Sequence, residues 1–163
     1  MAVLVVVVCS LILLFGTVVF VGAPYLPTMR PQIEAAFDLL ELKKGQTLLE
    51  LGCGDGRVLV EAAKRGYRAV GIELNLVLVF VALWRTRRYR DNVRVIWGNY
   101  WAKPWPPSDA VFTFLLDSFM PKLDKHMQYY GGKLASVAFR IPGRVIEKEH
   151  NGVYLYVYDK PLA

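Results

Sequence analysis

Cysteine and histidine are scarce in this chain, with two of each among 163 residues. Cys9 lies in a long apolar run and Cys53 in a glycine-rich turn, so neither a disulfide framework nor an oxidising compartment is indicated. His126 and His150 do not stand in a zinc-ligand spacing, and we therefore expect no metal site.

Charged side chains are absent from the first 29 residues, although the whole chain carries a formal net charge of +6. Within this segment, 22 residues (AVLVVVVCSLILLFGTVVFVGA) are almost wholly apolar. As a helix they would extend about 33 Å, enough to cross a hydrocarbon core of about 30 Å. A cleaved signal peptide would have a basic start and an apolar stretch of only about 7–15 residues. The segment therefore favours an uncleaved transmembrane anchor over residues 1–23.

The first basic residue, Arg30, follows this segment directly. The positive-inside rule then predicts a single-pass membrane protein whose folded domain lies on the cytoplasmic side. The remaining length suits one domain with a sizeable core. We expect three parts: the anchor (1–23), a membrane-proximal segment with the first helix (24–44), and the main domain (45–163).

The main domain alternates short apolar runs with helical patterns. Strands are expected at 47–51, 67–74, 92–98, 109–116 and 133–141, and helices from about 31 to 40 and at 57–66, 75–90 and 117–132. No helix fits between the third and fourth strands, because residues 99–108 contain three prolines. Two further runs flank Asn151 and Gly152, a strong hairpin signal. The pattern predicts an α/β fold: a Rossmann-like, doubly wound, mostly parallel sheet with a C-terminal antiparallel hairpin, preceded by one transmembrane helix.

A glycine-rich turn follows the first expected strand, in the sequence LELGCGDGR. A strand, such a turn and a helix form the ligand-binding corner of a doubly wound sheet. The dinucleotide fingerprint G-x-G-x-x-G is met by Gly52 and Gly54, but its third glycine position is occupied by Arg57, and Gly56 comes one residue early. The turn therefore departs from a dinucleotide site.

Three acidic residues surround this turn. Glu50 and Asp55 oppose the binding of a phosphate and suit a ligand with positive charge and hydroxyl groups, such as S-adenosylmethionine. Glu73 follows Gly54 by 19 residues, where a carboxylate can accept hydrogen bonds from a ribose diol. Structural roles alone are the alternative: Asp55 as a helix N-cap and Glu73 as a surface acid at a strand end.

The segments ELGCGDGR and GIELN resemble motifs I and II of the class I, seven-strand methyltransferases, and the resemblance covers about residues 24–160. APYLPT before the first helix and VFTFLLDSFMPKL after the fourth strand add a likeness to the small membrane-anchored protein-lysine methyltransferases and their prokaryotic relatives. The resemblance implies S-adenosylmethionine as cofactor and a transfer of its methyl group.

The resemblance also implies roles for individual residues. The glycines would let the backbone approach the methionine part of the cofactor, the first two acids would hold its amino group, and Glu73 would bind the ribose. Asn99 stands where the family often has an acid near the adenine, and Tyr100 or Trp101 could cover the ring. The candidate cofactor-binding residues are Glu50, Gly52, Cys53, Gly54, Asp55, Gly56, Glu73, Leu74, Asn99 and Tyr100.

Asp117, at the end of the fourth expected strand, is the candidate catalytic residue. A lysine nucleophile has a reference pKa of about 10.4 and must lose a proton, which burial or a nearby acceptor must assist. Asp117 is a carboxylate that could hold the incoming ammonium. The alternative is that Asp117 caps the next helix. The family likeness also suggests that Tyr25 and Thr28 close over the site.

The sequence predicts a membrane-anchored enzyme that methylates a protein lysine, with the bilayer and a protein as its partners. A lipid or small-molecule substrate is one alternative, and a degenerate scaffold with the same fold is another. No nucleic-acid partner is expected, because the fourth strand ends in LLDSF and not in a motif of the NPPY type.

Two further segments leave alternatives open. RTRRYR (85–90) is either the solvated end of a helix or a patch that faces anionic lipid. WAKPWPP (101–107) is either a packed loop or part of the substrate mouth.

Overall fold

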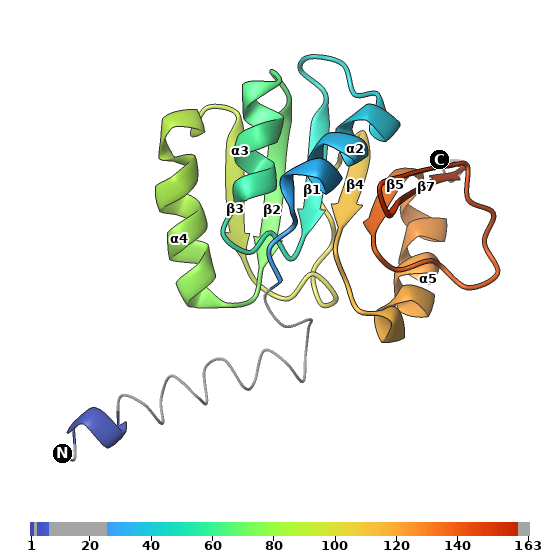
Figure 1. Cartoon of the computed structure of the whole chain (residues 1–163). Coiled ribbons are helices and arrows are strands. Elements are labelled where there is room, and N and C mark those ends of the chain that lie inside the picture. The colour runs from blue at the N-terminus through green and yellow to red at the C-terminus, as the bar shows by residue number, and fades with distance from the viewer. Residues whose placement is uncertain (2, 7–25, 160–163) are drawn as a thin grey trace.

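The computed structural model describes residues 1, 3–6 and 26–159. Its centre is a seven-stranded sheet with the strand order β3-β2-β1-β4-β5-β7-β6 (Figure 1). The strands are β1 (Thr47–Leu51), β2 (Arg68–Glu73), β3 (Val93–Trp97), β4 (Ala110–Thr113), β5 (Gly132–Val137), β6 (Lys148–His150) and β7 (Val153–Tyr158). The first five are parallel to one another, whereas β7 runs antiparallel to both β5 and β6. The predicted sheet and its C-terminal hairpin are therefore confirmed.

The predicted anchor over residues 1–23 lies almost entirely outside the described residues. Within the described ranges, no helix combines the length and the apolar character needed to cross a membrane.

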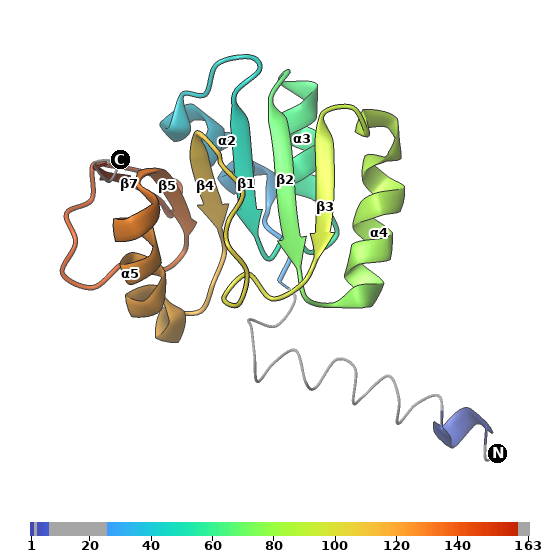
Figure 2. The ribbon, with the colours of Figure 1, turned by 180° about the vertical axis from the view of Figure 1, so that it is seen from behind.

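Helices cover the two faces of the sheet unequally. The helices α2 (Arg30–Leu40), α3 (Arg57–Lys64) and α4 (Leu76–Thr86) lie on one face, and α5 (Met120–Tyr130) lies on the other, beside β4 and β5 (Figures 1 and 2). As predicted, no helix occurs between β3 and β4, where every residue is described. Val70 of β2 and Ile96 of β3 consequently stay only half-buried.

The core forms two clusters, one on each side of the sheet. On one side, apolar residues of α2 and α3 pack against β1, β4, β5 and β7. On the other side, Met120, Leu123 and Met127 of α5 pack against the opposite faces of the same strands. Because alternate residues of a strand point to opposite faces, Leu48 joins the first cluster and Leu49 the second. The helix α2 thus belongs to the same core as the sheet.

Some predicted boundaries were too long. The strand β5 ends at Val137 because Ala138 adopts a left-handed backbone with φ 66°, which breaks the extended ladder. The helix predicted over 75–90 ends at Thr86 and continues as the 3₁₀ turn η1 (Arg87–Tyr89). The hairpin between β6 and β7 turns at Asn151 and Gly152, with φ 50° and 71°, as its signal predicts.

Candidate functional site

The glycine turn follows β1 and bends across the end of β2. The backbone N–H groups of Gly52 and Cys53 both donate to the carbonyl of Ile72, at 2.8 and 3.2 Å. Gly52, Gly54 and Gly56 have φ angles of 76°, 52° and 76°, in the region that residues with a Cβ avoid. The backbone of the turn therefore favours glycine at all three positions, and Cys53 is a buried thiol inside it.

Glu73 ties the end of β2 to this turn. Its carboxylate accepts hydrogen bonds from the backbone N–H of Gly54 and of Asn75, both at 2.8 Å. The residue is only 6% exposed, so the alternative of a surface acid at a strand end is wrong. Leu74 follows at the mouth of the turn, half-buried, and its carbonyl accepts from the indole N–H of Trp97.

Glu50 is a buried carboxyl group whose Oε2 has no hydrogen-bond partner among the described residues. Burial raises the pKa of the Glu50 carboxyl well above its usual range, and the nearby charges of Asp55 and Glu73 raise it further. A buried polar atom without a partner is costly and uncommon. This oxygen is therefore free to pair with a donor or cation of a bound ligand.

Asp55 forms ion pairs with Arg57 of α3 at 3.0 Å and with Arg85 of α4 at 2.9 Å. Burial pushes the pKa of the Asp55 carboxyl upward, but the two arginines outweigh it, so that the pKa is lowered. Gly56, and not Asp55, is the N-cap of α3, although Asp55 accepts from the backbone N–H of Arg57 at 3.2 Å. The carboxylate thus joins the turn to two helices, and its predicted contact with a cofactor amino group stays a prediction.

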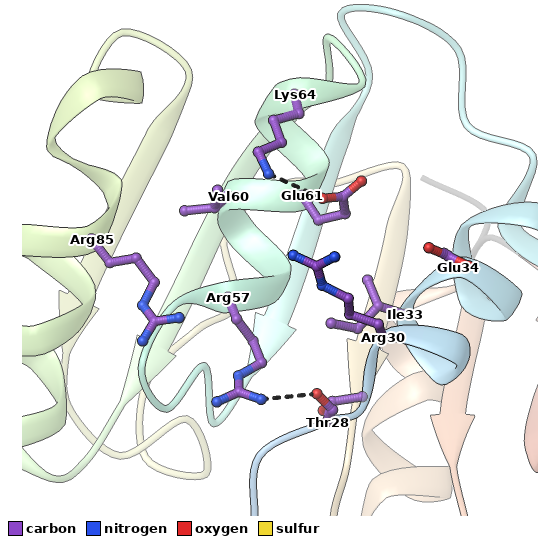
Figure 3. Close-up of a pocket in the computed structure, with 9 residues that line it drawn as sticks. All are labelled: Thr28, Arg30, Ile33, Glu34, Arg57, Val60, Glu61, Lys64 and Arg85. Carbon is purple, nitrogen blue, oxygen red and sulfur yellow. Dashed lines mark hydrogen bonds and ion pairs between the residues drawn. The ribbon is translucent and has the colours of Figure 1, made fainter.

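The two arginines also line a cleft of about 480 Å³ between α2, α3 and α4 (Figure 3). The guanidinium of Arg57 donates to the carbonyl of Thr28 at 3.3 Å, which fixes the segment before α2 next to α3. Thr28 is buried there, whereas Tyr25 lies outside the described residues. The cleft is lined by Thr28, Arg30, Ile33, Glu34, Arg57, Val60, Glu61, Lys64 and Arg85, and by no residue of the glycine turn itself.

The loop after β3 meets the glycine turn at Tyr100. This buried ring lies 3.9 Å from the point where a Cβ on Gly52 would stand. Burial, together with the charge of Glu73, raises the pKa of the Tyr100 hydroxyl. Asn99 is half-buried, and its side-chain oxygen accepts from the backbone N–H of Trp101 at 2.8 Å. The structure thus brings Asn99 and Tyr100, which are predicted to lie near the adenine, close to the glycine turn, which is predicted to lie against the methionine part of the cofactor.

The segment 101–107 packs against the domain through its two tryptophans, whereas Ala102, Lys103, Pro104 and Pro107 are exposed, and its predicted part in a substrate mouth stays a prediction. The indole N–H of Trp105 donates to the carbonyl of Tyr100 at 2.8 Å. Trp105 stacks on His126 with 5.5 Å between ring centroids, and Trp101 contacts the same ring at 5.3 Å. Burial and the charge of Lys122 lower the pKa of His126. Across the described part of the chain, no group of three His, Cys, Asp or Glu residues could hold a metal ion.

Asp117 is exposed and is the first residue of the 3₁₀ turn η2 (Asp117–Phe119). Leu116 is the N-cap of this turn and Phe119 is the N-cap of α5, so the alternative that Asp117 caps the next helix is wrong. The fourth strand was predicted to end at residue 116, but β4 ends at Thr113, so Asp117 follows it after three further residues, of which Leu115 is buried. The role predicted for it, holding the incoming ammonium, stays a prediction.

Residues 50–148 match the model of the ANTKMT methyltransferase domain. The chain belongs to this family. The match begins at Glu50 in β1 and ends in β6, so that it contains the glycine turn, Glu73, the loop after β3 and Asp117, but not Thr28 or α2. The resemblance to class I methyltransferases is thereby confirmed.

Relatives of this ANTKMT-family chain carry lysine methyltransferase names. It is 39% identical over 128 residues to a Caenorhabditis elegans protein named as a lysine N-methyltransferase of an ATP synthase subunit, a match that covers 73% of this chain and 67% of the relative. It is 29% identical to a protein-lysine N-methyltransferase of Saccharolobus islandicus (strain REY15A), over 82% of this chain and 92% of the relative. The chain spans about half the length of the vertebrate relatives that it matches.

Solved structures share the fold of the ANTKMT domain. The RNA methyltransferase of Salinibacter ruber, in complex with S-adenosylhomocysteine, has a TM-score of 0.74 and 25% identity, over 82% of this chain and 92% of that chain.

Proposed function

We propose that this chain is an S-adenosylmethionine-dependent methyltransferase that modifies a lysine of a protein. The observation that carries the proposal is the family match, which spans a glycine turn and a buried acid at the end of β2 in the arrangement that this cofactor requires. The names of the relatives favour lysine as the acceptor.

The residues of the turn fit this cofactor. Gly52 leaves the space above the turn open apart from the ring of Tyr100. The unpartnered oxygen of Glu50 suits the cofactor's amino group, and the buried carboxylate of Glu73 suits its ribose hydroxyls. When bound, the cofactor supplies an electrophilic methyl group on a sulfonium.

The work of the protein is then mainly positioning, which can supply roughly 7–11 kcal/mol of the barrier. The exposed carboxylate of Asp117, in the 3₁₀ turn η2 that follows β4, would hold the incoming lysine ammonium near the reacting centre. An adjacent carboxylate favours the charged form of lysine, so Asp117 serves to capture and orient the substrate, and proton loss must follow capture.

The proposed enzyme is anchored in a membrane by residues 1–23, with its domain on the cytoplasmic side. The apolar run and the basic residue Arg30 directly after it support this placement. A domain tethered in this way suits a membrane protein as substrate.

The first experiment is a calorimetric titration of S-adenosylmethionine and S-adenosylhomocysteine into the full chain in detergent. Glu73→Ala and Glu50→Ala should lose binding, whereas Glu149→Ala, an exposed acid on β6, should keep it. A folded wild-type chain that binds neither ligand would contradict the enzyme proposal and favour a degenerate scaffold with the same fold.

The second experiment is transfer of a labelled methyl group onto membranes. Label that is recovered in protein and identified as methyl-lysine by mass spectrometry supports the proposal. Label that is recovered in extracted lipid would instead identify a lipid as the substrate. RNA methylation is the second candidate, because the Salinibacter neighbour is named for it, and label released by ribonuclease would favour it.

A further inference from the structure

The helix α4 carries apolar side chains on the side that faces away from the sheet. One stripe of the helix, including Val79, Ala82 and Thr86, is buried against the domain. The opposite side consists of apolar residues that are 36–65% exposed, and we call it the α4 outer face: Leu76, Val77, Phe80, Val81, Leu83 and Trp84. A surface helix of a soluble domain is normally polar on this side.

Nothing in the described part of the molecule covers the α4 outer face. The helix is the outermost one of its layer, at the β3 edge of the sheet, and no described element lies beyond it (Figures 1 and 2). Large exposed apolar patches of this kind mark interaction sites.

The C-terminal end of the same helix is strongly basic. Arg85, Arg87, Arg88 and Arg90 follow the apolar residues, and no acidic residue occurs between 76 and 90. The guanidinium of Arg87 lies 4.3 Å from the centre of the Trp84 ring, so the basic and apolar parts form one continuous surface. Apolar and aromatic residues beside arginines are typical of helices that lie in the interface of an anionic bilayer.

The helix α4 also shares a cleft with the segment that precedes α2, because Arg85 and Thr28 both line it. The guanidinium of Arg57 donates to the carbonyl of Thr28. Asp55 forms ion pairs with both Arg57 and Arg85 of α4. Only residues 24–29 separate the proposed anchor from α2, and six residues reach at most about 20 Å. If the anchor proposed above spans the bilayer, the bilayer surface therefore lies close to α4, and the inference rests on that part of the proposed function.

From this geometry we infer that the α4 outer face docks on an anionic lipid bilayer. The apolar side chains insert among the headgroups and upper acyl chains, and the exposed Arg87, Arg88 and Arg90 contact anionic headgroups, whereas Arg85 is paired with Asp55. A second copy of the chain fits this face less well. In a two-fold pair, the arginines would meet either one another or the apolar residues of the partner.

The test uses the full chain reconstituted into vesicles of phosphatidylcholine, with or without phosphatidylglycerol and with or without brominated acyl chains. Bromine quenches tryptophan emission only within the bilayer, so Trp84 serves as the reporter, and Trp84→Phe defines how much of the signal comes from it. Phe80→Glu places a charge on the docking face. Tyr129→Glu is the matched control, because Tyr129 is an aromatic residue that is 82% exposed on α5, away from α4.

We expect quenching in the wild type and in Tyr129→Glu, and its loss in both Trp84→Phe and Phe80→Glu. The quenching should increase with phosphatidylglycerol and weaken with salt, because the Debye length falls from about 10 Å at 0.1 M to about 3 Å at 1 M. Flotation with the vesicles is measured on the same samples. A chain that floats without quenching from Trp84 overturns the docking alone, whereas a chain that does not float overturns the anchor as well. Crosslinking between two copies through α4 would show that a second copy of the chain, and not the bilayer, occupies the α4 outer face.

Discussion

Gly71 determines how closely the glycine turn can lie against β2, and replacing it with alanine tests the geometry of the site. A Cβ on Gly71 would lie 2.6 Å from both the Cβ and the Sγ of Cys53, and 2.7 Å from Cδ1 of Leu59. Ordinary contacts begin at 3.4 Å, so the deficit at Cys53 is 3.4 − 2.6 = 0.8 Å. The end of the Leu59 side chain can rotate away. The Sγ of Cys53 can also rotate, but its Cβ moves only with the backbone, whose N–H is hydrogen-bonded to the carbonyl of Ile72, and the turn must therefore shift.

Overpacking of this size costs about 1–3 kcal/mol of folding free energy. At about 2–4 °C per kcal/mol, Gly71→Ala should lower Tm by roughly 2–12 °C. A displacement near 1 Å in a positioning element can reduce a reaction rate by about 100-fold, so both methyl transfer and the affinity for S-adenosylhomocysteine should fall. Thermal unfolding and calorimetry of the full chain measure the two effects.

The control is Gly152→Ala in the β6–β7 turn, where no atom lies within 4 Å but φ is 71°. The left-handed backbone alone makes this variant about 1–2 kcal/mol less stable, without an effect on the cofactor site. Wild-type affinity for S-adenosylhomocysteine in Gly71→Ala would refute the reasoning, since the turn would then not depend on this contact.

Three other substitutions have defined outcomes. Glu73→Gln should weaken S-adenosylhomocysteine binding in calorimetry and cost about 1–3 kcal/mol of stability in urea, because two backbone N–H groups lose a charged acceptor; unchanged stability would contradict this. Because the pKa of Glu50 is raised, the folded state holds a proton that the unfolded state loses, so stability should fall as pH rises above the ordinary glutamate value of 4.5. Glu50→Gln should flatten this pH dependence in urea unfolding. An equal change of unfolding free energy with pH in the wild type and the variant would contradict it. Burial raises the pKa of Asp124, but bonds from Arg144 and Tyr158 outweigh it and lower the pKa, so this carboxylate stabilises the fold above the ordinary aspartate value of 3.8 and loses its effect on acidification. Asp124→Asn should therefore be about 1–2 kcal/mol less stable at neutral pH and approach the wild type in acid.

Features that depend on local sequence were predictable. The central strands are apolar runs bounded by turn residues, and the Asn151–Gly152 pair specifies the hairpin turn. The position of Glu73 beside Gly54 follows from the spacing along a strand, a helix and a strand, which is set by the geometry of the fold. Asn75, the first residue of the predicted helix, is instead the N-cap of α4, and its side chain accepts hydrogen bonds from two backbone N–H groups.

Contacts between side chains of separate elements had no such signal. The pairing of Asp55 with Arg85 joins residues 30 positions apart, and nothing in either neighbourhood specifies it. Arg57 in the third position of the fingerprint was the one hint that a cation lies at the turn. The enclosure of His126 by two tryptophans and the left-handed Ala138 depend on packing of the whole domain and not on local preference.

The central position of β1 has a consequence for the order in which the sheet assembles. Leu48 pairs with Ala69 of β2 across 69 − 48 = 21 positions and with Ala110 of β4 across 110 − 48 = 62. Closing the longer loop costs about 1 kcal/mol more in chain entropy, and parallel pairing over such distances is slow. The half of the sheet that carries the glycine turn can therefore form while the ribosome is still adding the second half. The last strands, β6 and β7, form a local hairpin that pairs with β5 and packs against α2 on one side of the sheet and α5 on the other.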